Sequence, residues 1–283
     1  MKNYIRLVRP KHWLKNVFVF VPITFALELL HLGKLLNVGI AFAAFCLVSS
    51  AVYIFNDICD AKQDAAHPIK CKRPIASGAI STPSAVVLML FVLVAGFVLA
   101  FISGVLVCIS VAAYLVINIL YTKWLKHVPV FDCFCIAAGF VLRVYAGGAA
   151  YGGGLSDWLF LTVVAMSLFM AFGKRRGELE KMGGGTSTRE VLRLYNTGFL
   201  DGILFANAGL SIVFYSLWSM ERGSGMIYTV PLIIFIVCKY LLLVFKSDSQ
   251  GDPTSVIFAS KTLIGACAFY ALLTIGLLYI GSV

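Results

Sequence analysis

The sequence predicts an all-α protein that crosses a lipid bilayer several times. Hydrophobic residues make up 60% of the 283 residues and charged residues only 13%, with a mean hydropathy of +0.94, whereas soluble domains carry about a quarter charged residues. The apolar residues also occur in runs of roughly 20, the length that a helix needs to cross the hydrocarbon core. Finally, the basic residues gather in alternate connections between these runs. Together these observations exclude a soluble globular fold.

Nine apolar runs are long enough to span the membrane, and each is predicted to be a helix. The first lacks a small-residue cleavage site, so we expect a retained helix rather than a signal peptide. Only Ser103 and Gly104 separate the third run from the fourth, which predicts a tight turn. The whole chain, residues 1–283, is therefore predicted to be one transmembrane domain, whose spans are 14–32, 37–57, 83–102, 104–122, 129–150, 157–173, 198–220, 226–246 and 262–282.

The distribution of Lys and Arg predicts the orientation. Most of them lie in the first 15 residues and in the connections 58–82, 123–128, 174–197 and 246–261, whereas the opposite side holds Lys34 and Arg222. Because basic residues collect on the cytoplasmic side, we expect the N-terminus inside and, with nine helices, the C-terminus outside. The net charge of +10 then reflects orientation and contact with anionic lipid. No basic, aromatic-rich module predicts a nucleic-acid partner.

Three aspartates begin at the end of the second run. On a continuing helix Asp57, Asp60 and Asp64 share one face, with Asn56 beside them. Carboxylate oxygens suit Mg²⁺, which binds through one or two carboxylates together with substrate phosphates. A solvated helix end is the alternative, but three acids beneath an apolar helix repel one another without a cation. We therefore expect these aspartates to be the metal-binding and catalytic residues, and Asn56 to bind substrate.

Basic residues follow the aspartates within ten positions. Lys70 and Arg73 can donate to phosphate oxygens, and Arg73 can do so bidentately. The alternative is a basic loop that only fixes orientation. Acidic and basic groups together are what a metal-bound diphosphate requires, so this connection predicts a cytoplasm-facing active site.

Further candidate substrate-binding residues lie at other helix ends on the same predicted side. For Lys15 and Asn16 the alternative role is that of an interfacial anchor. For Lys174 and Arg175 the alternative is a stop-transfer cluster. Arg143 lies eleven residues beyond Asp132, or roughly 16 Å deeper on a helix. A guanidinium facing lipid there costs several kcal/mol, so Arg143 should face an internal polar cavity. The set is Lys15, Asn16, Tyr121, Lys126, Asp132, Arg143, Lys174, Arg175 and Glu178.

Several of these stretches resemble a known family. Nine helices with an Asn56-Asp57-x-x-Asp60-x-x-x-Asp64 motif after the second resemble the UbiA superfamily of intramembrane prenyltransferases, over essentially the whole chain. Within it, the sequence is most similar to the decaprenyl-phosphate phosphoribosyltransferases. That resemblance is carried by Arg9-Pro10-x-x-Trp13-x-Lys15-Asn16, by the block from Asn56 to Gly78, by Gly139-Phe-Val-Leu-Arg143, by Phe172-Gly173-Lys174-Arg175-Arg176-x-Glu178 and by Gly251-Asp252-Pro253.

The resemblance implies a Mg²⁺-dependent glycosyltransferase in the bacterial inner (plasma) membrane. Its expected reaction moves 5-phosphoribose from phosphoribosyl pyrophosphate (PRPP) to a polyprenyl phosphate, releases pyrophosphate and forms polyprenyl-phosphoryl-5-phosphoribose for the cell envelope. A homo-oligomer is compatible with it.

Two alternatives stay open. The first is a prenyltransferase of this superfamily that acts on an aromatic acceptor with a polyprenyl diphosphate donor. Such members carry a second Asp-x-x-x-Asp between the sixth and seventh helices, where this chain has Lys174-Arg175-Arg176. A transporter is favoured by the intramembrane charges Arg143 and Lys239, but transport sites usually lie at the bilayer midplane, whereas the aspartates lie at its predicted boundary.

Overall fold

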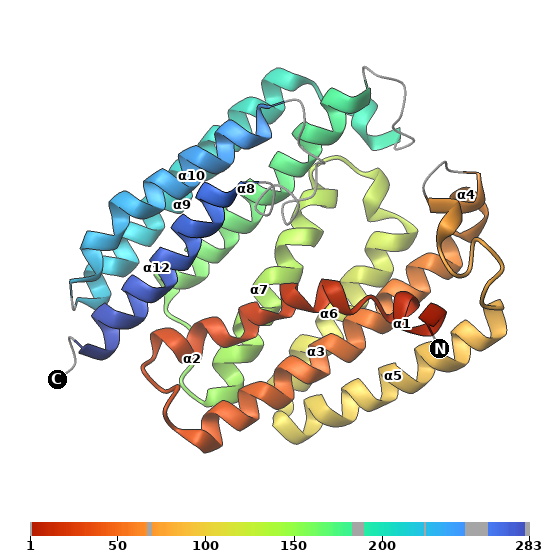
Figure 1. Cartoon of the computed structure of the whole chain (residues 1–283), viewed down its shortest axis with the longest axis horizontal. Helices are drawn as coiled ribbons and strands as arrows, with labels where there is room; N and C mark the ends of the chain where they lie inside the picture. The colour runs from red at the N-terminus through yellow and green to blue at the C-terminus, as the bar shows by residue number, and fades with distance from the viewer. Residues whose placement is uncertain (1, 67–69, 183–189, 224, 247–259, 281–283) are drawn as a thin grey trace. The chain divides into compact units, whose positions relative to one another are not determined.

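The structure, a computed structural model, describes residues 2–66, 70–182, 190–223, 225–246 and 260–280. In these residues the regular elements are all helices (Figure 1), and eight helices are long and apolar enough to cross a membrane. The predicted fold class is therefore confirmed. By its internal contacts the chain forms two compact units, one of residues 1–124 with 142–154 and the other of residues 125–141 with 155–283.

The first unit is built around a pair of closely packed helices, α3 and α5 (Figure 1). The buried residues Val38, Ala41, Phe45, Val48 and Val52 recur every three or four positions along α3 and form one apolar stripe. The unit comprises α1 (Lys2–Val8), the 3₁₀ helix η1 (Pro10–Phe20), α2 (Val21–Phe25), α3 (Leu32–Cys59), α4 (Ala61–Ala65), η2 (Lys70–Lys72), α5 (Thr82–Ser103), α6 (Val105–Lys123) and the last part of α7 (Phe131–Tyr151).

The outer face of α5 carries a second apolar stripe. Its members are 53–70% exposed, which a soluble protein rarely tolerates over a contiguous surface. Lipid tails satisfy such a face, so this stripe supports the membrane assignment. It consists of Val87, Phe91, Val94, Val98 and Phe101.

The first predicted span, 14–32, differs from a single membrane-spanning helix. Its residues form most of η1 and then the short α2, and the chain turns at Leu27, whose φ is 64°. Pro22 lacks the amide that a continuous helix needs, and it lies at the start of α2. The predicted tight turn between the third and fourth spans is present, because Gly104, with φ 144°, both ends α5 and caps α6.

The second unit contains the remaining helices. Helix α8 extends nine residues beyond the predicted end at 173, because Arg, Glu, Leu and Met favour helix and because Arg176 pairs with Glu180 one turn later at 2.9 Å. Hydropathy detects only the membrane-embedded part of such a helix. The elements are η3 (Leu125–His127), the first part of α7, α8 (Asp157–Met182), η4 (Glu190–Leu194), α9 (Thr197–Arg222), η5 (Met226–Thr229), α10 (Val230–Val244) and α12 (Lys261–Ile280).

Candidate functional site

Two of the three predicted aspartates are joined by one arginine. Helix α3 ends at Cys59, Asp60 caps it, and α4 begins at the next residue, so Asp57 and Asp64 stay on one side of a nearly continuous helix. Arg73 Nη1 donates to Asp57 Oδ1 at 3.0 Å and to Asp64 Oδ2 at 2.5 Å. Asp57 and Asp64 are buried, whereas Asp60 is only partly buried. The metal-binding role of Asp60 stays a prediction.

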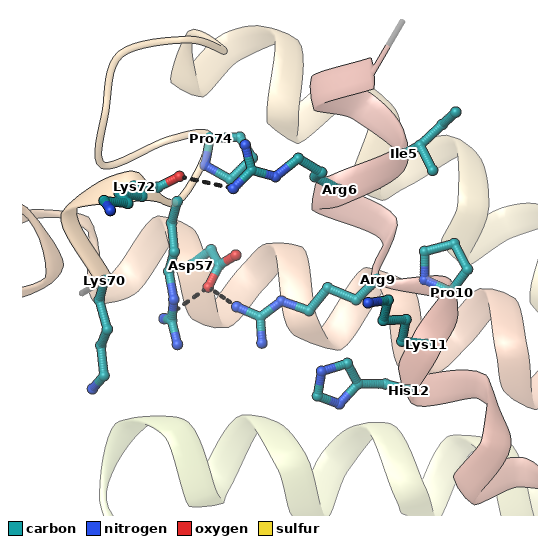
Figure 2. Close-up of a pocket in the computed structure, with 11 residues that line it drawn as sticks. Ile5, Arg6, Arg9, Pro10, Lys11, His12, Asp57, Lys70, Lys72 and Pro74 are labelled. Atoms are coloured by element: carbon teal, nitrogen blue, oxygen red, sulfur yellow. Dashed lines mark hydrogen bonds and ion pairs between the residues drawn. The ribbon is translucent and has the colours of Figure 1, made fainter. Parts of the chain in front are cut away.

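A second arginine reaches Asp57 from the N-terminal segment. Arg9 has a left-handed backbone, with φ 55° and ψ 58°, which is uncommon for a residue with a Cβ, and Pro10 disfavours ordinary helical geometry at the position before it. The resulting bend separates α1 from η1. It allows Arg9 Nη2 to donate to Asp57 Oδ1 at 2.6 Å, an approach that Figure 2 shows from the segment of Pro10 and Lys11. The guanidinium carbon also lies 5.3 Å from the ring centre of Tyr53.

The second carboxylate oxygen of Asp57 is available. In the part of the chain that the structure describes, Oδ2 is buried and has no hydrogen-bond partner. An unpaired buried polar atom costs about 1–3 kcal/mol, and more when it is charged, so such atoms usually mark a place for an ion, a water or a ligand. Asp57 therefore combines one oxygen held by arginines with one oxygen free to coordinate.

A pocket of about 670 Å³ opens at Asp57 (Figure 2). Among the described residues that line it, Asp57 is the one acid, Ile5, Pro10 and Pro74 supply apolar surface, and six residues are basic. This concentration of positive charge attracts polyanions, and arginine and lysine are the usual phosphate-binding side chains. The pocket has the chemistry of a phosphate-binding site with an acidic edge, and its basic residues are Arg6, Arg9, Lys11, Lys70, Lys72 and Arg73.

The donor set fits a divalent cation that shares its ligands with a phosphate. Within the described ranges, no three or more acidic, histidine or cysteine side chains gather closely enough to hold a metal by themselves. Mg²⁺ needs only one or two carboxylates when substrate phosphates and waters complete its shell. Asp57 has an oxygen without a hydrogen-bond partner among the described residues, and Asp64 contacts the same Arg73 guanidinium as Asp57. These two carboxylates meet that requirement.

Arg143 is buried in the first unit, as expected. Its Nε donates to Asn16 Oδ1 at 2.7 Å and its Nη2 donates to Tyr114 Oη at 3.1 Å. Asn16 in turn donates to Cys46 Sγ at 3.2 Å and to Ser49 Oγ at 3.3 Å. These residues form a polar network that joins η1, α3, α6 and α7, so the guanidinium is satisfied away from lipid. The predicted role of Arg143 and Asn16 in substrate binding stays a prediction.

In the second unit, Asp132 and Arg175 form an ion pair in which both residues are 0% exposed. Arg175 Nε donates to Asp132 Oδ2, and Nη1 donates to Glu178 Oε2, each at 2.5 Å. Tyr195 Oη donates to Asp132 Oδ1 at 2.7 Å and accepts the Val130 N–H at 2.6 Å. Burial raises the pKa of the Tyr195 phenol; the Val130 amide opposes this rise and the Asp132 carboxylate adds to it. Both oxygens of Asp132 therefore have partners.

The remaining predicted substrate-binding residues are half-buried on described elements, and their roles stay predictions. Lys15 lies on η1, Asn56 on α3, Tyr121 on α6, Lys126 on η3 and Lys174 on α8. The family-like stretch Gly251-Asp252-Pro253 lies outside the described residues.

Sequence reasoning missed two residues of these clusters. Arg9 is not among the predicted site residues, although it belongs to one of the family-like motifs, which is the available signal. Tyr195 had no comparable signal, because it lies 63 positions from Asp132 in a connection without a recognisable pattern.

Known proteins resemble this chain along most of its length. The model of the UbiA prenyltransferase family matches residues 17–262. The decaprenyl-phosphate phosphoribosyltransferase of Mycolicibacterium smegmatis is 34% identical over 93% of this chain and 88% of its own length. That of Corynebacterium glutamicum is 32% identical, over 92% and 81%. Among solved structures, a UbiA homolog from Archaeoglobus fulgidus bound to GPP and Mg²⁺ has a TM-score of 0.76 at 17% identity, covering 99% of this chain and 100% of that chain. This last likeness concerns the fold alone.

Proposed function

This chain belongs to the UbiA prenyltransferase family, and we propose that within the family it is a polyprenyl-phosphate phosphoribosyltransferase. It moves 5-phosphoribose from PRPP to a polyprenyl phosphate and releases pyrophosphate. Similarity over 93% of the chain to an enzyme named for this activity carries the proposal. The pocket around Asp57, with its six basic residues, supports it, because PRPP carries a 5-phosphate in addition to its diphosphate.

The reaction is a substitution at the anomeric carbon. An oxygen of the acceptor phosphate forms the new bond to C1 of the ribose, and the bond from C1 to the pyrophosphate oxygen breaks with its electron pair leaving on pyrophosphate. The acceptor phosphate has a second pKa of about 6 and is already anionic near neutral pH, so the chain needs no strong general base. Its task is to position the groups and stabilise charge.

Asp57 and Asp64 are the residues that would hold Mg²⁺, with Asp60 as the predicted third ligand. Bound Mg²⁺ would neutralise negative charge on the departing pyrophosphate. Arg9, Lys70 and Arg73 surround the same carboxylates and supply donors to the diphosphate. The other predicted residues, apart from the Asp132 and Arg175 pair, retain their proposed role in binding substrate.

We also propose a location and a domain organisation for this protein. The protein lies in the bacterial plasma membrane with its N-terminus in the cytoplasm, following the distribution of Lys and Arg, and residues 1–283 act as one domain. Assembly into a homo-oligomer stays a prediction. Neither alternative activity is proposed, since the connection 174–197 contains no aspartate and the aspartates of the site lie in the last turn of a spanning helix and just beyond it.

The test is a transfer assay with the purified full-length protein in detergent. With Mg²⁺, radiolabelled PRPP and decaprenyl phosphate, we expect label in the lipid and one pyrophosphate released for each lipid modified. A parallel reaction with geranylgeranyl diphosphate and 4-hydroxybenzoate tests the aromatic alternative and should give no product. Absence of transfer from PRPP across several polyprenyl chain lengths would overturn the proposal.

A further inference from the structure

We infer that Arg73 is an exchangeable counter-ion, which neutralises Asp57 and Asp64 in this structure and moves to the diphosphate when metal and diphosphate enter together. The metal is then loaded with the substrate rather than before it. The inference rests on the proposed function only in taking a metal-bound diphosphate as the ligand of this site.

The contacts of Arg73 are suited to exchange. A single nitrogen, Nη1, donates to both carboxylates. One movement of the guanidinium therefore frees Asp64 Oδ2 and leaves Asp57 Oδ1 with Arg9. The Arg73 side chain is 26% exposed, whereas the side chains of Asp57 and Asp64 are 1% and 4% exposed. The carboxylates are therefore fixed in the protein, and the arginine is the partner that can move into the pocket.

The local charge disfavours a bare cation. Asp57 and Asp64 face three cations, since Arg9 contacts Asp57, Arg73 contacts both, and Lys70 Nζ lies 3.9 Å from Asp64 Oδ1. A lone divalent ion adds positive charge to a pocket whose described lining already contains six Lys and Arg residues and one acid. A metal-bound diphosphate carries net negative charge, so the same cations attract it.

The open oxygen of Asp57 gives the exchange a starting point. Oδ2 is buried and unpartnered among the described residues, so an entering metal can bind there while the arginines still hold Oδ1. Asp64 Oδ2 becomes available only when Arg73 leaves it, while Asp64 Oδ1 lies 3.9 Å from Lys70 Nζ. Arg73 and the metal therefore compete for Asp64 Oδ2, and the diphosphate is the group that draws Arg73 away.

Two binding measurements on the full-length protein test this exchange. Electron paramagnetic resonance of free Mn²⁺ gives the affinity for the bare metal, and filter binding of radiolabelled pyrophosphate at saturating Mn²⁺ gives the affinity for the complex. In Arg73→Gln we expect bare Mn²⁺ to bind at least threefold more tightly than in the wild type, and pyrophosphate with Mn²⁺ to bind at least tenfold more weakly. A purely structural role would weaken both.

Arg6→Gln is the matched control. Arg6 lines the same pocket, but its guanidinium donates to the backbone carbonyl of Lys72, at 3.5 Å, rather than to a carboxylate. Removing this guanidinium lowers the positive charge of the pocket but takes no hydrogen-bond donor from Asp57 or Asp64. The affinity for bare Mn²⁺ should therefore change less than twofold. An equal gain in both variants, or no gain in Arg73→Gln, overturns the inference.

Arg73→Lys keeps the charge and covers the case in which Arg73→Gln does not fold. Nζ of lysine lies one bond closer to Cα than Nη1 of arginine and cannot occupy the position from which Nη1 contacts both carboxylates. A smaller gain in bare Mn²⁺ affinity is therefore expected, and no gain overturns the inference. Neither measurement uses PRPP or lipid. If the exchange is observed but the transfer assay fails, the proposed substrates are wrong and the exchange stands.

Discussion

Asp57 and Asp132 are both buried aspartates paired with arginine, yet their surroundings differ in the property that matters for ligand binding. The arginine side chains on Asp57 are 18% and 26% exposed, and its Oδ2 has no partner among the described residues. The arginine on Asp132 is 0% exposed, and both carboxylate oxygens are bonded. One aspartate faces a pocket of basic residues, and the other lies in a closed network.

This difference shows that a buried ion pair does not by itself indicate an active site. Desolvation makes a completed pair such as Asp132 and Arg175 hard to break, so it serves to hold α7, α8 and the segment of Tyr195 in place. At Asp57 one carboxylate oxygen lacks a partner among the described residues and both arginines are partly exposed. A ligand can therefore replace these arginines. We expect the first region to carry the chemistry and the Asp132 region to carry stability, which departs from the substrate-binding role predicted for Asp132 and Arg175.

The largest expected effect is on catalysis at Asp57. Asp57→Asn should lower the rate of transfer by about three orders of magnitude, or about 4 kcal/mol, because the amide binds a divalent cation poorly. Its thermal unfolding in detergent should stay close to that of the wild type. Near-normal turnover would remove Asp57 as a metal ligand.

The next effect is on stability at Asp132. Asp132→Asn removes the buried carboxylate from Arg175, which keeps Glu178 as an acidic partner, and should lower the free energy of unfolding by about 3 kcal/mol. Turnover per folded molecule should change less than threefold. Loss of turnover in a fully folded variant would instead support substrate binding by Asp132 and break the comparison.

Tyr195→Phe should destabilise the protein by about 2 kcal/mol at pH 8, because it leaves the Val130 amide and one Asp132 oxygen unpaired. Burial raises the pKa of the Tyr195 phenol above its usual value of about 10. This contribution is complete below about pH 10 and is lost as the pH rises further, since the phenol of the unfolded chain ionises first. The free energies of unfolding of wild type and variant should therefore differ less at pH 11 than at pH 8.

Arg9→Lys should have the smallest effect. It keeps the positive charge near Asp57 but loses the planar fork that binds phosphate bidentately. We expect the KM for PRPP to rise about tenfold, or about 1.4 kcal/mol, with little change in kcat or in unfolding temperature. A large loss of kcat with unchanged KM would assign Arg9 to the transition state rather than to binding.

The sequence was sufficient for those features that depend on local periodicity. Apolar runs located eight helices, and the spacing of Asp57 and Asp64 placed both on one face. It could not show that Arg9 contacts Asp57, 48 residues away, or that Tyr195 completes the network of Asp132, because these contacts follow from tertiary packing. The sequence also did not predict that the first span divides into the 3₁₀ helix η1 and the short α2. Hydropathy measures how apolar a segment is and not whether its helix is continuous.

The most direct test of the account measures, per folded molecule, the transfer of label from PRPP to decaprenyl phosphate by the wild type, Asp57→Asn and Asp132→Asn under identical conditions. The account predicts transfer by the wild type, retention of most of it in folded Asp132→Asn, and its loss in folded Asp57→Asn. Absence of transfer by the wild type, or equal rates in wild type and Asp57→Asn, would contradict it.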